Sequence, residues 1–510
     1  MSLVSLEFLV FILIVAIIYF VLPGKVQWIF LLVASSVFFC LNSSVVQVWN
    51  LAIFLAINFV LSLIMSKQTD RRKLVFVCVV IFDITYLLIF KYFSFFMPIL
   101  GVCGISNPKL SRINEALIEL APMGISYMAL IVIGYMAELY WEHIEVQKNV
   151  GKFALFSIFF PQIVSGPIVK YQEYDGYLWG EKHTFSYDRV VSGIERTIWG
   201  VFKKLVISSR AGIVANTIYD NYHVYTGFYI PVGIVFYIIQ LYCDFSGLMD
   251  IVIGVSEILG TKMPENFNTP FYSETMAEFW RRWHITLGRF LKEYILFPMQ
   301  TSGWFRKLRK AYKKAVGKSF EKKFNLPRYF TMLISWTFIG FWHGGGWNYI
   351  WGVGIYMWIV TTLGEILEPV FNKLIGALKI NTDCFSWILF RRARTFALYM
   401  FGVSFFWARS IKDGFALWKN AFASFNPWIF VDKSLYSLGL SREEMMILGV
   451  SIILLFVVSH IKQKKSAREA LNEQNYIFRV AVYMVLIAMT VVWGHYGSGF
   501  DAASFIYGKF

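Results

Sequence analysis

Long apolar runs recur along the chain, separated by short polar or basic segments. Examples are FLVFILIVAIIYFVL, from Phe8 to Leu22, and MILGVSIILLFVV, residues 446–458. Backbone N–H and C=O groups in lipid must be hydrogen-bonded internally, which a helix achieves within one segment. The pattern therefore predicts an all-α, multi-pass integral membrane protein. We expect the first run to be a retained span, because no Lys or Arg precedes it and no small-residue cleavage site follows before Lys25.

The regularity of these runs changes along the chain. Residues 1–140 alternate simple apolar runs with short loops, as a scaffold of spanning helices does, whereas Gly, Pro and polar residues interrupt the apolar stretches from Phe153 to about Trp351. Irregular backbone at membrane depth is tolerated only where protein or a water-filled cavity surrounds it, so we expect a site in this part. Conventional spans return in 396–510, around an amphipathic, external segment, 412–444. We expect a single membrane domain over 1–510.

Composition and charge agree with this organisation. The chain is 57% hydrophobic and only 16% charged, which excludes an ordinary soluble globular protein. Its net charge is +16, and the Lys and Arg residues that produce it lie in short segments between apolar runs. The positive-inside rule expects this distribution, so the charge does not indicate a nucleic-acid partner. Placing those segments in the cytoplasm puts the N-terminus on the extracytoplasmic side of the cell membrane. The basic segments are 67–73, 141–152, 303–328, 391–394 and 462–468.

The cysteines give no sign of a disulfide framework or a metal site. They are five in number and scattered, without a CxxC pair. We expect each to be a small, buried apolar residue. They are Cys40, Cys78, Cys103, Cys243 and Cys384.

Two carboxylates lie in an otherwise apolar stretch, LYCDFSGLMDIVIG, residues 241–254. An ionisable residue at membrane depth is a functional hypothesis, normally with a cavity or a partner nearby. The alternative is a structural ion pair or a helix cap, and for Asp250 that alternative is at least as strong. Asp244, beside Ser246 and Gly247, is the better candidate for lining a site.

The stretch FPQIVSGPIVKY, residues 160–171, contains two prolines and a glycine that break a regular helix while its flanks stay apolar. It is either an ordinary turn between helices or a re-entrant or interfacial element. We slightly favour the second interpretation.

The stretch EFWRRWHITLGRF, residues 278–290, predicts an interfacial helix. Its apolar residues recur at helical spacing and form one broad stripe, and Glu278 and Arg282 are four apart and can pair. His284 lies close to the stripe. Periodicity alone favours a packed core histidine hydrogen-bonded to backbone over a catalytic one.

A second histidine lies in ISWTFIGFWHGGGWNYIWG, residues 334–352. His343 stands between two apolar runs, and three glycines follow it, which loosen a helix and let a ligand or another backbone approach. A solvated surface histidine does not explain this position, so we favour function over structure for His343.

Taken together, these residues resemble a known family. The run PENFNTPFYSETMAEFWRRWHITLGRFLKEYILFP, followed by the histidine of FWHGG, is similar to the membrane-bound O-acyltransferases, and within them to the bacterial branch of the alginate O-acetyltransferases. The stretches SLEFLVFILIVAIIYFVLP, PQIVSGPIVKY, DFSGLMDIVIG and SFIYGKF have counterparts in that branch. The resemblance implies roughly 11 spanning helices with re-entrant or interfacial helices around a central tunnel.

The resemblance also implies an activity. It is acetyl transfer from a cytoplasmic thioester, acetyl-CoA, to hydroxyls of an extracytoplasmic polysaccharide or partner protein, with no permanently bound cofactor or metal. His343 matches the family's essential histidine, the general base, because a histidine titrates near neutrality. His284 matches the second conserved histidine. We expect 150–365 to be the catalytic core, with these supporting residues: Asp244, Trp280, Arg281, Arg282, Trp283, Trp342 and Asn348.

Other readings stay open. D-alanyl transfer to teichoic acid from a carrier protein would share the histidines. For transfer to the polysaccharide, we expect a secreted or membrane-anchored esterase-like partner protein to complete the reaction. A transporter or flippase would need no chemistry, but we find no inverted repeats to support it. The chain has no GxSxG elbow. Its one HxxxxD, His183 to Asp188, lies in a polar segment and we interpret it as chance.

Overall fold

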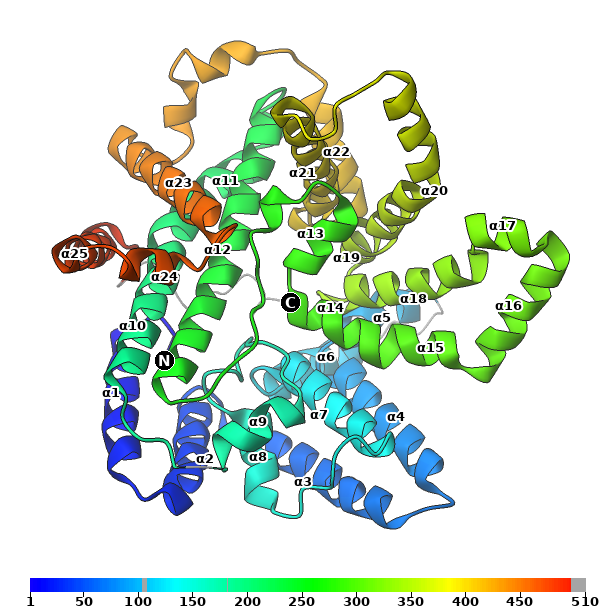
Figure 1. Ribbon diagram of the computed structural model, residues 1–510, viewed down its shortest axis with the longest axis vertical. Helices are drawn as coiled ribbons and strands as arrows, with labels where there is room; N and C mark the ends of the chain where they lie inside the picture. The colour runs from blue at the N-terminus through cyan, green and yellow to red at the C-terminus, as the bar shows by residue number, and fades with distance from the viewer. Residues whose placement is uncertain (103–107, 181, 497–510) are drawn as a thin grey trace. The chain divides into compact units, whose positions relative to one another are not determined.

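The computed structural model describes residues 1–102, 108–180 and 182–496 of the chain, so Cys103 and the SFIYGKF ending lie outside the described residues. The regular secondary structure of the described residues is helical, and their only β-type pairing is an isolated bridge between Phe267 and Trp283. The predicted all-α class is confirmed (Figure 1).

The helices group into two compact units. The first comprises 1–205, 244–265 and 474–510, and the second comprises 206–243 and 266–473. The long helix α12 (Tyr229–Ile258) contributes to both, and η1 (Lys203–Ser208), a π-helix, crosses the boundary. The expectation of one functional domain over the whole chain stays a prediction.

The first unit contains most of the N-terminal helices. Neighbouring helices α2 and α8, α3 and α4, and α4 and α7 pack against one another. The helices of this unit are α1 (Leu6–Val21), α2 (Gly24–Leu41), α3 (Val45–Lys67), α4 (Arg72–Phe90), α5 (Phe93–Val102), α6 (Pro108–Leu120), α7 (Ile125–Tyr140), α8 (Val150–Ile158), α9 (Tyr171–Leu178), α10 (Tyr187–Phe202) and α25 (Tyr476–Trp493).

Small residues set the crossing of α10 and α12. A Cβ on Gly200 would lie 2.5 Å from the carbonyl oxygen of Gly247, and one on Gly193 would lie 2.6 Å from that of Gly254. Only glycine lets the two backbones approach this closely, which is a common device between membrane helices.

The segment between α8 and α9 is not helical, yet it is almost entirely buried within the first unit. Its chain is held partly by side chains, since the backbone N–H of Phe160 donates to Ser35 Oγ at 3.1 Å. It also passes so close to Gly124 that a Cβ there would collide with the carbonyl oxygen of Ile163. The predicted break in regular helix is confirmed, and protein surrounds the irregular backbone, as burial in lipid requires.

The second unit carries both histidines and much of the irregular part of the chain. It contains several short helices and the π-helices η3 and η4, a form that often marks functional sites. Its elements are α11 (Ser209–Asp220), η2 (Pro270–Tyr272), α13 (Met276–Arg282), α14 (Ile285–Leu291), η3 (Lys292–Leu296), α15 (Phe297–Thr301), α16 (Gly303–Val316), α17 (Lys318–Lys323), α18 (Leu326–Trp342), α19 (Trp347–Tyr349), η4 (Ile350–Ile355), α20 (Tyr356–Ala377), α21 (Phe385–Trp407), α22 (Ile411–Ala421), η5 (Pro427–Phe430), η6 (Ser434–Ser437), α23 (Arg442–Lys462) and α24 (Ala467–Asn472).

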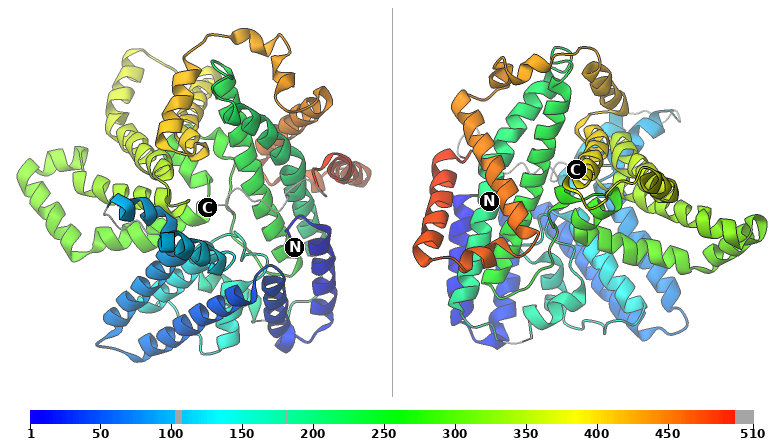
Figure 2. Two further views of the ribbon diagram at one scale, coloured as in Figure 1. Left: turned by 180° about the vertical axis from the view of Figure 1, so that it is seen from behind. Right: turned by 45° about the horizontal axis from the view of Figure 1, so that its top comes forward.

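Within this unit, α18 packs closely on η4, and η4 on α21. A Cβ on Gly340 of α18 would lie 2.7 Å from Ile350 Cα, and one on Gly352 would lie 2.6 Å from the carbonyl oxygen of Gly402. Helices α15 and α18 run alongside each other, with α16 and α17 joining their far ends (Figure 1 and Figure 2).

Seven helices of the described chain are long and apolar enough to cross a membrane, and the bent pair α6 and α7 raises the number to eight if it forms one span. These helices confirm a multi-pass membrane protein, while the predicted number of roughly 11 spans stays a prediction. Three of the four described cysteines depart from expectation, because Cys40 and Cys78 are exposed on apolar helices and Cys384 is only partly buried.

Candidate active site

The chain around His284 does not form the single interfacial helix that the sequence predicted. Helix α13 ends at Arg282, His284 adopts a left-handed backbone conformation with φ 49° and ψ 53°, and α14 begins at Ile285. The predicted continuous helix is therefore wrong. The Glu278–Arg282 pair is confirmed, with 2.8 Å between Oε1 and Nη2.

A buried asparagine explains the break. Asn266 accepts hydrogen bonds at its side-chain Oδ1 from the backbone N–H and the hydroxyl of Thr286, at 3.1 and 3.0 Å. Its backbone carbonyl accepts from the N–H of Ile285 at 3.0 Å. Neighbouring residues Phe267 and Trp283 form the antiparallel bridge. These bonds replace the helical bonds that α13 would otherwise continue, so the helix ends before His284.

The same oxygen fixes the histidine. Nδ1 of His284 lies 3.2 Å from Asn266 Oδ1. Because the backbone N–H of Thr286 can only donate, the atom facing it must be the oxygen of the amide, and His284 must then donate from Nδ1. In the neutral imidazole, Nε2 therefore carries the lone pair.

The environment favours the neutral form of His284. The residue is only 3% exposed and lies outside the candidate spans. Burial lowers the pKa of His284 well below its ordinary value, and the nearby His343 lowers it further, because a charged imidazole is costly in both situations.

His343 caps the C-terminal end of α18, and its side chain is buried. Gly345 ends the helix with a left-handed φ of 64°, and its N–H donates to the carbonyl of Phe341 at 2.8 Å. A Cβ on Gly344 would lie 2.6 Å from the ring of Tyr349. The glycines therefore serve a tight turn and a close side-chain contact, and the backbone carries His343 at a fixed position.

An indole links the two histidines. The rings of Trp342 and His343 are 5.2 Å apart between centroids, and those of Trp342 and His284 are 6.2 Å apart. Phe406 of α21 packs edge-on against His343 at 5.4 Å. Two histidines far apart in sequence thus lie around one tryptophan, at the end of α18.

The remaining supporting residues of this unit fall into two groups. Trp280 and Trp283 belong to an aromatic cluster with Phe279 and Tyr399, in which the ring centroids of Phe279 and Tyr399 are 4.3 Å apart. Asn348 is buried and donates to the backbone carbonyl of Ala408 at 2.8 Å, so it also ties α19 to the end of α21. The two tryptophans lie close to His284 in the sequence, whereas the contacts of Asn348 are structural.

The two neighbouring arginines differ. Arg282 is engaged, because besides pairing with Glu278 it donates to the hydroxyl of Thr269 at 3.2 Å. Arg281 is exposed at the end of α13. Of the two guanidinium groups, that of Arg281 is therefore the more accessible to an anion.

The two aspartates of α12 lie in the first unit and both form ion pairs. Asp250 accepts from Arg196 at 2.9 Å and from Lys203 at 2.6 Å, which matches the structural alternative for this residue. Asp244 pairs with Lys204, and both side chains are buried. The role of Asp244 in lining a site stays a prediction.

The HxxxxD match belongs to the first unit. His183 of the HxxxxD match stacks on Tyr19, and its backbone N–H donates to Gln27 in the first unit. Within the described residues, no group of three or more His, Cys, Asp or Glu side chains could hold a metal ion.

Sequence reasoning did not single out Asn266 or Tyr399. Asn266 stands in the polar PENFNTP run between Glu265 and Phe267, and no signal in the sequence distinguishes its buried side chain from the neighbouring Asn268. Tyr399 carries no signal either, because it lies within an ordinary apolar run far along the chain.

Known proteins share this region. A model of the membrane-bound O-acyltransferase family matches residues 147–366, which include both histidines. The chain is similar to a probable alginate O-acetylase of Pseudomonas syringae, with 30% identity covering 75% of this chain and 66% of the relative. It is also similar to a peptidoglycan O-acetyltransferase of Helicobacter pylori, with 28% identity over 56% of this chain and 55% of the relative.

A teichoic acid D-alanyltransferase of Bacillus subtilis is 27% identical over 60% of this chain and 72% of the relative. The aligned part spans about two thirds of the length of the Pseudomonas relative, 66%. The chain belongs to the membrane-bound O-acyltransferase family.

Proposed function

We propose that this membrane-bound O-acyltransferase moves an acetyl group from cytoplasmic acetyl-CoA to hydroxyls of an extracytoplasmic polysaccharide or partner protein. The observation that carries the proposal is the meeting of His284 and His343 around Trp342, within the region that the family model matches. The acetyl group follows from the alginate and peptidoglycan relatives, which are named as acetylating enzymes.

His343 acts as the general base. It accepts the proton of the acceptor hydroxyl while that oxygen attacks the thioester carbonyl carbon. The carbon–sulfur bond then breaks, and the thiolate of CoA leaves and takes up the proton from His343. Burial supports this role, because a site without bulk water protects the thioester from hydrolysis.

His284 orients the reacting groups in the neutral form. Its Nδ1 proton is donated to Asn266, so Nε2 is the nitrogen that we assign to the contact with a hydroxyl or with the developing imidazolium of His343. The lowered pKa of His284 supports this assignment, since a second positive charge beside His343 would oppose proton uptake there.

The donor side is assigned to the basic groups near α13. Arg281 is exposed and suits the phosphates of CoA, while Arg282 holds the loop through Glu278 and Thr269. The N-terminus lies on the extracytoplasmic side of the plasma membrane, and a secreted or membrane-anchored esterase-like protein completes the transfer to the polymer. The positive-inside distribution of Lys and Arg supports this orientation.

A second candidate is D-alanyl transfer to teichoic acid from a carrier protein, which the Bacillus relative favours. It uses the same histidines and replaces CoA by a carrier-bound thioester. A transporter without acyl chemistry is the alternative of another class.

The experiment uses purified protein in proteoliposomes. It follows a labelled acetyl group from acetyl-CoA to alginate or peptidoglycan fragments, and a labelled D-alanyl carrier to teichoic acid in parallel. His343→Ala is expected to lose roughly 100-fold or more of the rate, the usual scale of general base catalysis. The matched control is His460→Ala, an exposed histidine of the same unit, which should transfer at the normal rate.

Each outcome discriminates. Full transfer by His343→Ala would overturn its role as the base, and transfer only from the D-alanyl carrier would select the second candidate. Solute flux without thioester turnover would overturn the proposed acyl-transfer activity and favour a transporter.

A further inference from the structure

Helix α16 stands out from the rest of the second unit by its charge. It carries six Lys or Arg residues in the sequence GWFRKLRKAYKKAV and no acidic residue. Together with α17 it joins the far ends of α15 and α18 (Figure 1 and Figure 2). Nothing in the proposed acyl transfer requires this composition.

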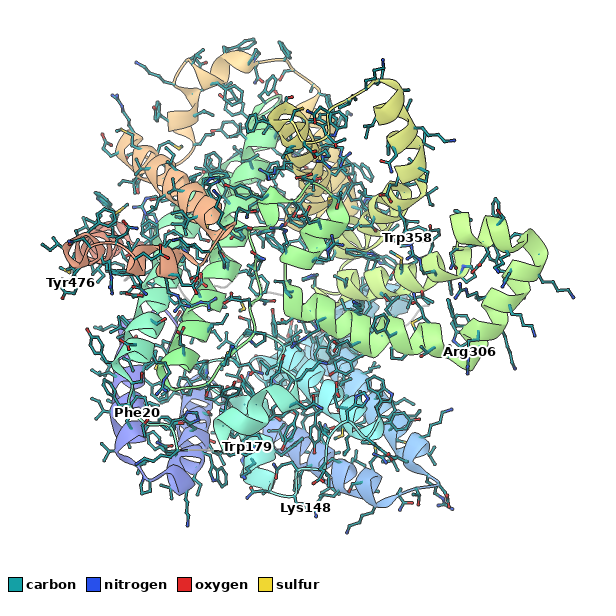
Figure 3. The ribbon with its side chains drawn as sticks, in the orientation of Figure 1. Phe20, Lys148, Trp179, Arg306, Trp358 and Tyr476 are labelled. Atoms are coloured by element: carbon teal, nitrogen blue, oxygen red, sulfur yellow. The ribbon has the colours of Figure 1, made fainter. Side chains whose placement is uncertain are left out.

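The side chains of α16 divide into three faces at helical spacing. One face packs on the protein, a second is apolar and exposed, and the third is basic. The packed face holds Phe305, Tyr312 and Val316, with the exposed Arg309 at its edge. The exposed apolar face holds Trp304, Leu308, Ala311 and Ala315. The basic face holds Arg306, Lys307, Lys310, Lys313 and Lys314, and Arg306 is labelled in Figure 3.

The packed face is well anchored. Phe305 is buried, and the Nε of Arg309 lies 2.7 Å from Oε1 of Glu321 in α17. The hydroxyl of Tyr312 donates to the backbone carbonyl of Phe324 at 2.9 Å. The orientation of α16 within its hairpin is therefore fixed, and so is the direction of the other two faces.

The exposed apolar face lacks the cover that apolar side chains need in water. Trp304 is 48% exposed and Leu308 is 39% exposed, and Phe320 of the adjoining α17 is 51% exposed. Lys307 and Lys314 border this face, where long side chains can reach past an apolar layer to charged groups. An apolar stripe bordered by cations is typical of helices that lie in the plane of a membrane surface.

We propose that α16 is an in-plane anchor that binds the anionic lipid surface of the membrane. Its Trp304, Leu308 and Ala311 face enters the acyl-chain boundary, and its basic face binds lipid phosphates. Charge complementarity favours this occupant, because every charged residue of the helix is a cation. The proposal is independent of the acyl-transfer reaction.

The first test measures depth by spin labelling of the full chain without its native cysteines. Labels at Leu308→Cys and Ala311→Cys are compared with labels at Lys310→Cys and Lys313→Cys in vesicles containing phosphatidylglycerol. The first pair is expected to be accessible to oxygen and protected from a water-soluble nickel chelate, and the second pair to show the reverse. Equal access of the chelate to all four labels would overturn the proposal.

The second test measures bound lipid by native mass spectrometry. A variant with R306Q, K307Q, K310Q, K313Q and K314Q is expected to retain roughly half as much phosphatidylglycerol as the wild type. The control removes the same charge at exposed sites elsewhere, through K67Q, R71Q, K73Q, K148Q and K464Q. Equal loss in both variants would indicate only general attraction and would overturn a specific anchor.

A third arm identifies a rival occupant. The labels at positions 308 and 311 are measured in vesicles before and after an acidic acyl-carrier protein is added. Protection from the chelate that arises only after this addition would assign the apolar face to the carrier protein and overturn the lipid anchor.

Discussion

The imidazole of His284 donates from Nδ1 to Oδ1 of Asn266, 3.2 Å away, and the same oxygen accepts the backbone N–H of Thr286. One amide thus fixes both the ring of the histidine and the turn that carries it. Asn266 is a positioning residue that the sequence alone did not reveal.

Asn266→Asp should move the pH dependence of transfer. Burial first, and His343 second, hold the pKa of His284 below its usual range, so the wild-type imidazole stays neutral as the pH falls. A carboxylate at position 266 still accepts the hydrogen bond but favours the charged imidazole, and so raises the pKa of His284.

If neutral His284 is needed, the rate of Asn266→Asp will fall at a higher pH than that of the wild type. Initial rates across the acidic range check this prediction. Asn266→Ala lacks the hydrogen-bond acceptor, so the imidazole of His284 is misplaced and the rate of transfer should fall roughly 100-fold at every pH. If the rate of Asn266→Asp falls at the same acidic pH as that of the wild type, the proposed role of neutral His284 is contradicted.

His284→Asn and His284→Val should separate folding from activity. The left-handed φ of 49° suits asparagine, whereas a β-branched residue is strained there by about 1–2 kcal/mol. Both variants should be inactive, but only His284→Val should show a clearly lower thermal unfolding midpoint in detergent. Equal destabilisation would mean that backbone conformation does not constrain this position.

Asn348→Asp should destabilise the second unit. The side-chain amide donates to the carbonyls of Phe405 and Ala408, and a carboxylate would place negative charge against both. The expected loss is about 1–3 kcal/mol in the free energy of unfolding. Thermal unfolding measures it, and His343→Gln serves as a control that should be inactive without a comparable loss. An Asn348→Asp protein of normal stability and no activity would instead make Asn348 a site residue.

Asp250→Asn should be among the most destabilising single changes in the first unit. It removes the negative charge between the side chains of Arg196 and Lys203, which are largely buried. Breaking such a pair costs about 3–5 kcal/mol. The control Asp70→Asn alters an exposed carboxylate and should stay within about 0.5 kcal/mol. A variant as stable as the control would show that the network contributes little.

The sequence predicted the features that depend on local pattern. Apolar runs predicted the helical class, and i,i+4 spacing predicted the Glu278–Arg282 pair, because both are properties of neighbouring residues. Helical spacing wrongly predicted a continuous helix between Arg282 and Ile285, because the apolar stripe continues there although the helix ends. The break depends on Asn266, which lies outside the stretch and contacts it only after folding.

The same reasoning applies to the rest of the site. The histidines and Trp342 could be named from their motifs, but not the position of the indole between the two imidazoles or the ring of Phe406 against His343. Aromatic residues are abundant along the chain, and sequence gives no means of choosing which of them meet.

The two histidines occupy opposite poles of their helices. His343 caps the C-terminal end of α18, where the aligned peptide dipoles present partial negative charge, and His284 precedes the N-terminal end of α14, where they present partial positive charge. Such an end contributes about 0.3–1 kcal/mol to a charge of the opposite sign. The end of α14 therefore acts in the same direction as burial, which lowers the pKa of His284, while the end of α18 presents the opposite polarity at His343.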